Sequence, residues 1–91
     1  MNPLAAEAIM ALVFFGKDPN TDGDECPTAW VDDKNADMVL QGWKADEETE
    51  AECLTVGPIP GTEAVIRIPA RMVPLIRKAC DAAEQRSSEL R

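Results

Sequence analysis

The strongest constraint on the fold is a one-sided helical pattern near the C-terminus. Apolar residues recur there every three or four positions, with charged and amide side chains between them. The apolar stripe consists of Met72, Leu75, Ile76, Ala79, Cys80 and Ala83. Pro74 is compatible only with a first turn, so we predict a helix over residues 71–86 and fraying beyond it. Such a helix must bury its apolar face against another element.

The middle of the chain has the alternation of β-strands. Residues 28–31 and 38–44 fit two strands joined by a turn at 32–37, and residues 63–68 fit a third strand that Pro69 ends. Residues 46–52 fit either a loop or a short helical turn. We therefore predict one α+β domain over residues 1–91, in which a three-stranded antiparallel sheet (residues 28–68) packs against the C-terminal helix.

The N-terminal segment reads as a second helix, over residues 3–15. Asn2 and Pro3 suit the N-cap and first helical position, and Gly16 suits the C-terminus. The apolar residues of this segment cover almost the whole helix circumference, which is typical of a helix buried on all sides. Two interpretations are open: a central core helix, or a helix shielded by self-association or by a hydrophobic partner.

The same apolar segment does not predict export or membrane insertion. It lacks a basic flank, Glu7 interrupts it, and it is shorter than the ~20 apolar residues that span a bilayer. We expect a cytoplasmic protein without a membrane partner.

Charge is unevenly distributed along the sequence. Between Lys17 and Glu52 there are 12 carboxylates and three lysines, whereas the remainder to Arg91 has six basic and four acidic residues. The net charge of −8 argues against direct binding to nucleic acid, because phosphates require a basic surface. Attraction to a basic protein, or imitation of nucleic acid, remains compatible with it.

Side chains for catalysis are scarce. There is no histidine or tyrosine, and the serines are confined to Ser87 and Ser88. Cys26, Cys53 and Cys80 form no CxxC pair, which favours reduced, buried thiols over a disulfide framework or a zinc site. We predict that the protein is not an enzyme and has no cofactor.

An acidic loop at residues 18–27 partly matches a calcium-binding loop. Oxygen-bearing side chains stand at its first, third and fifth positions, and a glycine stands at the sixth. The candidate ligands are Asp18, Asn20, Asp22 and Asp24. The twelfth position is Ala29 in place of the usual glutamate, so an ordinary turn-rich surface loop is the favoured interpretation.

Residues for contact with a partner fall into three sets. The N-terminal segment contributes Ile9, Val13 and Phe14 as apolar contacts. Trp30 and Trp43 would lie on adjacent antiparallel strands and share a face, either in the core or as interaction anchors. Glu47, Glu48 and Glu50 belong to an acidic run that would steer a basic partner.

Two blocks of sequence carry a family resemblance. Cys26-Pro27-Thr28-Ala29-Trp30 leads into Val39-Leu40-Gln41-Gly42-Trp43-Lys44, and Val65-Ile66-Arg67-Ile68-Pro69-Ala70-Arg71-Met72 opens a helix. Over roughly residues 26–83 the chain resembles small acidic actinobacterial proteins, some of them BldB-like, that are often encoded beside helix-turn-helix regulators. The resemblance implies a short antiparallel sheet with a C-terminal helix, and binding to a regulator protein rather than to DNA.

Together these patterns predict a non-enzymatic interaction module, dimeric, that modulates a helix-turn-helix transcription regulator. Two alternatives come from other features of the sequence. The carboxylates could form an acidic mimic of nucleic acid that blocks a DNA-binding protein. The loop at residues 18–27 could make the protein a calcium-dependent interaction switch.

Overall fold

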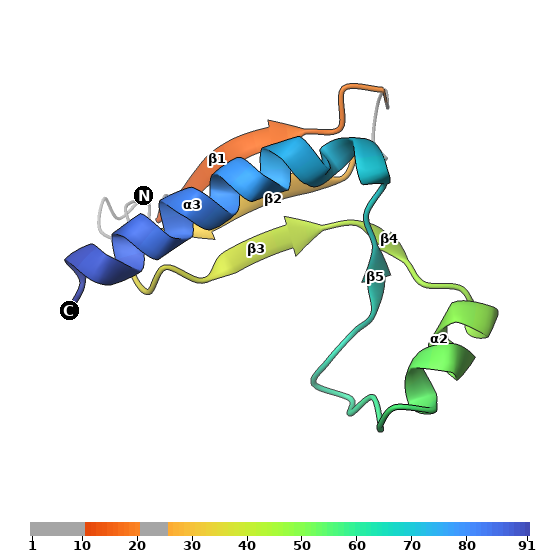
Figure 1. Cartoon of the computed structure of the whole chain (residues 1–91). Helices are drawn as coiled ribbons and strands as arrows, with labels where there is room; N and C mark the ends of the chain where they lie inside the picture. The colour runs from red at the N-terminus through yellow and green to blue at the C-terminus, as the bar shows by residue number, and fades with distance from the viewer. Residues whose placement is uncertain (1–10, 21–25) are drawn as a thin grey trace, which may run out of the picture.

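The computed structural model describes residues 11–20 and 26–91, and these form a body and an arm (Figure 1). The body, as we call it, contains a three-stranded sheet, a short 3-10 helix and a long C-terminal helix: β1 (Leu12–Lys17), β2 (Thr28–Asp32), β3 (Met38–Gln41), η1 (Ala70–Met72) and α3 (Val73–Glu89). The arm comprises residues 42–68 and contains β4 (Trp43–Lys44), α2 (Glu47–Leu54) and β5 (Ile66–Arg67). Figure 1 shows the arm extending away from the body.

The sheet of the body is antiparallel, with the order β1-β2-β3. Ala29 and Val31 in the central strand are buried on the face toward α3, and side chains alternate along a strand, so Trp30 belongs to the opposite face. The predicted turn between β2 and β3 is present, and the structure shows that Asx side chains stabilise it. Its backbone N–H groups at Lys34 and Asp37 donate to the side chains of Asp32 and Asn35.

The core lies between this sheet and α3. Val31 packs with Ala79 and Ala83, and Phe15 and Met38 contact this cluster. Two alanines at a spacing of four residues let the helix approach the sheet closely. The predicted C-terminal helix and its apolar face are confirmed, although α3 continues to Glu89 where we expected fraying after residue 86. Pro74 falls in the first turn of α3, as expected.

The predicted N-terminal helix is wrong where the structure can test it. Residues 12–15 belong to β1, which pairs with β2 through Val13 opposite Val31 and Phe14 opposite Trp30. The run Leu12–Phe15 is rich in β-branched and aromatic residues, and pairing with β2 outweighs the helical interpretation. Gly16 then adopts φ +153° at a β-bulge and does not end a helix. Residues 3–10 of the predicted helix lie outside the described residues.

The predicted third strand is also displaced from the sheet. Of the predicted residues 63–68, only Ile66–Arg67 forms a strand, and it pairs with Trp43–Lys44 in a separate two-stranded sheet. The expected strand over residues 38–44 is divided at Gly42, where an added Cβ would lie 2.7 Å from the carbonyl oxygen of Arg67. This close backbone approach requires glycine and marks the point where the chain leaves the body for the arm.

Candidate interaction surfaces

The face of the sheet opposite α3 is apolar and has no second layer in the described part of the chain. Phe14 and Val39 flank Trp30 from the two neighbouring strands, so the three side chains form a row across the sheet. Leu12 lies on the same face, two residues before Phe14. We call Leu12, Phe14, Trp30 and Val39 the open face. Phe14 is 56% exposed and Leu12 is 40% exposed, which is unusual for large apolar side chains so close together.

The open face contains only part of the predicted apolar contact set. Phe14 and Trp30 belong to it, but Val13 lies on the other side of β1, in a groove beside Ala82 of α3. Ile9 lies outside the described residues. Trp43 stands opposite Arg67 in the arm and does not share a sheet with Trp30. The prediction that the two tryptophans lie on adjacent strands is therefore wrong, because Gly42 ends β3 before Trp43.

The acidic run forms α2, a helix with no buried residue. Asp46 is its N-cap and accepts a hydrogen bond of 2.8 Å from the backbone N–H of Thr49. Hydrogen bonds from Thr49 hold the pKa of Asp46 below its usual value, and the charge of Arg67 acts in the same direction. Arg67 also donates a 2.6 Å hydrogen bond to the Thr49 hydroxyl and so attaches α2 to β5.

The position of α2 leaves its carboxylates available to other molecules. Glu47 and Glu48 are exposed and Glu50 is half-buried. The three lie in the first turn, where the helix dipole favours negative charge. The sequence left open a loop or a helical turn here, and the capping by Asp46 favours the helix.

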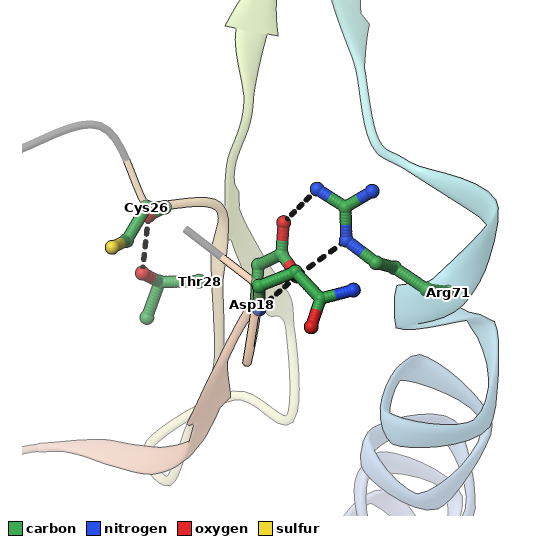
Figure 2. A network of polar contacts seen from close by, with 5 residues as sticks. Asp18, Cys26, Thr28 and Arg71 are labelled. Atoms are coloured by element: carbon green, nitrogen blue, oxygen red, sulfur yellow. Dashed lines mark hydrogen bonds and ion pairs between the residues drawn. The ribbon is translucent and has the colours of Figure 1, made fainter. Parts of the chain in front are cut away.

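Asp18, the first candidate calcium ligand, is occupied by an ion pair (Figure 2). Its side chain is fully buried, and its two oxygens accept hydrogen bonds of 2.7 and 2.6 Å from Nε and Nη2 of Arg71. The backbone N–H of Asn20 donates to the same carboxylate. The ion pair raises the pKa of Arg71, because hydrogen bonds to Asp18 stabilise the charged guanidinium.

This geometry gives Asp18 a structural role. A cation at Asp18 would have to compete with the guanidinium of Arg71, which already holds both carboxylate oxygens. Asp22 and Asp24 lie outside the described residues, so their part of the calcium prediction stays a prediction. Within residues 11–20 and 26–91 there is no cluster of three acidic or cysteine side chains suited to a metal ion.

A basic pocket, which sequence reasoning missed, adjoins this ion pair. It has a volume of about 290 Å³ and lies where β1 meets the start of α3. We use the name basic pocket for its lining residues: Gly16, Lys17, Pro19, Arg71, Met72, Pro74, Leu75 and Lys78. Lys17 and Lys78 are far apart in sequence, and only the packing of α3 on β1 brings them together.

A second pocket of similar volume lies at the other end of α3. It runs between β1 and the helix and is lined by Val13, Phe15 and Val31 among others. Arg86 lies beside it and donates a 2.8 Å hydrogen bond to the carbonyl of Asp33 while pairing with the Asp33 carboxylate at 3.2 Å. These contacts fasten the helix to the β2–β3 turn, so we assign this region to structural packing.

Comparison of the chain with protein-family models, with curated proteins and with solved structures gave no match. The resemblance to BldB-like proteins therefore stays a prediction from the quoted residues. Among the helices that the structure describes, none has the length and apolar character needed to cross a membrane.

Proposed function

We propose that this protein is a non-enzymatic interaction module that binds a DNA-binding transcription regulator of the helix-turn-helix class. The observation that carries the proposal is the open face, where Phe14 is 56% exposed beside Trp30. Contiguous apolar side chains on a surface are typical of protein contacts. The class of partner comes from the sequence resemblance.

The acidic helix α2 supports the same proposal from the electrostatic side. A DNA-binding regulator carries a basic surface, and the Glu47, Glu48 and Glu50 carboxylates would attract it over distances of about a Debye length. The open face would supply affinity and α2 would supply association rate. A partner of this kind and the three cysteines without a disulfide framework also support a cytoplasmic location.

Steering explains α2 better than imitation of nucleic acid does. A mimic must present carboxylates along a surface comparable to a DNA groove. The eight residues of α2 span only about 12 Å at 1.5 Å per residue. This length matches a local patch of charge.

The test begins with affinity capture from the native host using the purified, tagged chain. We expect a helix-turn-helix regulator among the captured proteins, and its identity then permits binding measurements with purified components. Phe14→Ser should weaken the equilibrium affinity more than about tenfold, since it removes an exposed aromatic anchor. Val56→Ser is the matched control, because Val56 is 93% exposed but lies in the arm.

Neutralising the carboxylates of α2 distinguishes its proposed role in the association rate from the role of the open face in affinity. The triple variant Glu47→Gln, Glu48→Gln, Glu50→Gln should slow association and reduce its salt dependence, with a smaller effect on dissociation. The proposal fails if repeated captures recover no DNA-binding regulator, or if Phe14→Ser binds the regulator as tightly as the wild type while retaining its circular dichroism spectrum.

A further inference from the structure

The basic pocket combines an apolar floor with a cationic rim. Met72 is 1% exposed, and Leu75 lies within 3.0 Å of the position that a Cβ on Gly16 would take. Lys17 and Lys78 are both exposed at the edge of the same hollow. A ligand that fits this chemistry has carboxylates beside an apolar group.

Arg71 gives the rim a fixed element. Nε and Nη2 of its guanidinium donate to Asp18, which sets the plane of the group (Figure 2). Among the described residues, Nη1 donates to none. The side chain of Arg71 is 40% exposed, so this edge can be reached from outside. An orientation fixed before binding lowers the entropic cost of contact with a carboxylate.

The complementary surface is on the arm of the same chain. Glu47, Glu50 and Leu54 recur at helical spacing and therefore share one face of α2. Leu54 is 53% exposed and the following Val56 is 93% exposed. Figure 1 shows α2 held well away from the start of α3, so the two surfaces do not meet within one chain.

The arm also lacks the buried apolar contacts that normally stabilise a short helix, and a partner could provide them. Helix α2 has eight residues and buries none of them, whereas isolated helices of fewer than about 12 residues are marginal in water. The N-cap of α2 and the hydrogen bond that it accepts from Arg67 are both exposed. Burial of Leu54 against another surface would supply the packing that the single chain does not provide.

We propose that the basic pocket binds the α2 face of a second copy of this chain. The two copies are related by a twofold axis, and α2 of each copy docks in the basic pocket of the other. Glu47 and Glu50 then face Lys17 and Lys78 of the other copy. Leu54 enters the apolar floor of that pocket. Such a reciprocal contact closes at two copies and does not propagate into a filament. The contact goes beyond the proposed function, and it needs only the chain itself.

The decisive experiment is a charge swap measured by sedimentation equilibrium on the purified full-length chain. The wild type should dimerise at about 100 µM, and raising the salt from 50 to 500 mM should weaken the dimer by about tenfold, because the contacts are between exposed charges. Two variants, Lys17→Glu/Lys78→Glu and Glu47→Lys/Glu50→Lys, should each be monomeric alone. Their equimolar mixture should associate, since both reciprocal contacts then pair opposite charges.

The control variant changes the net charge by the same amount as the α2 variant, at positions outside α2. Asp37→Lys/Glu63→Lys changes two exposed carboxylates outside α2 and should leave the dimer intact. Circular dichroism checks that each variant folds, and the pocket variant tests the contact even if the α2 variant loses its helix. A monomeric wild type, a dimer unaffected by the pocket reversal, or a mixture that stays monomeric would each overturn the proposal.

The outcome is separable from that of the regulator test, because no regulator is present. If the wild type is monomeric and the pocket reversal instead abolishes regulator binding, the pocket belongs to the regulator and the second copy is excluded as its occupant. If the dimer forms, regulator and second copy should compete, since both use the carboxylates of α2.

Discussion

The body and the arm differ in what holds them in shape. In the body, Ala29 and Ala79 are completely buried and Met72 is 1% exposed. In the arm, α2 buries no residue and Val56 is 93% exposed. The body is held by burial of apolar surface, whereas the arm is held by a helix cap, a two-residue ladder and the hydrogen bond from Arg67 to Thr49.

This difference separates stability from binding. Burial contributes roughly 25 cal/mol per Å² of apolar surface, so the free energy of unfolding depends mainly on the body. Side chains of the arm stay available for contact because the fold does not require their burial. Substitutions in the two regions should therefore have different consequences.

The largest expected effect is the loss of packing at Met72. Met72→Ala removes a fully buried side chain at the junction of η1 and α3, and should lower the free energy of unfolding by about 2–5 kcal/mol. Val56→Ala in the arm should change it by less than about 0.5 kcal/mol. Urea denaturation followed by circular dichroism measures both. Similar losses for the two variants would contradict the division into body and arm.

The next effect concerns the ion pair that joins the start of α3 to the loop after β1. Asp18→Asn removes the charge of a buried carboxylate that accepts two hydrogen bonds from Arg71, so we expect the Tm to fall by more than about 10 °C. Asp33→Asn, at the more exposed pair with Arg86, is the matched control and should change the Tm little. Differential scanning calorimetry distinguishes them, and equal effects would show that burial of Asp18 does not matter.

A smaller effect is expected at the boundary between body and arm. Gly42→Ala places a Cβ 2.7 Å from the carbonyl oxygen of Arg67, which must shift β5 relative to β4. We expect a destabilisation of about 1–3 kcal/mol, with amide shift changes concentrated at residues 43–44 and 66–67. Gly57→Ala is the control, since nothing lies within 4 Å of its Cβ position. Unchanged amide shifts in Gly42→Ala would contradict the close approach.

The smallest effect is the pH dependence of α2. Because hydrogen bonds from Thr49 lower the pKa of Asp46 in the folded chain, the charged cap stabilises α2 fully above its usual pKa of 3.8. This contribution is lost as the pH falls through the lowered pKa. The Thr49 amide shift should therefore titrate below pH 3.8, and Asp46→Ala should abolish that titration. A midpoint above 3.8 would contradict the cap.

The sequence correctly predicted the elements whose pattern is set by residues close together in the chain. The stripe from Met72 to Ala83 predicted α3, because a single apolar face at helical spacing has few other uses. The turn at residues 32–37 was predicted as well, and its cause is local: the side chains of Asp32 and Asn35 accept hydrogen bonds from nearby backbone N–H groups. Leu12–Phe15 was misjudged because a short apolar run fits a buried helix and a strand equally well.

For the candidate sites, too, the sequence revealed local features and missed those assembled from distant residues. The acidic character of α2 was evident from composition, but its projection from the body was not. Asp18 was a candidate calcium ligand, because the sequence does not reveal that Arg71, distant along the chain, donates to both of its oxygens. The basic pocket gave no signal at all, since it is assembled from β1 and α3.

The amino-acid order alone therefore determined the C-terminal helix, the β2–β3 hairpin and the acidic character of the middle segment, since each depends on neighbours a few positions apart. Only the tertiary structure decided that residues 12–17 form a strand, that Gly42 divides the chain into body and arm, and that Arg71 neutralises Asp18. Those outcomes depend on which distant segments pack together, and pairing energies between such segments are not encoded in local periodicity.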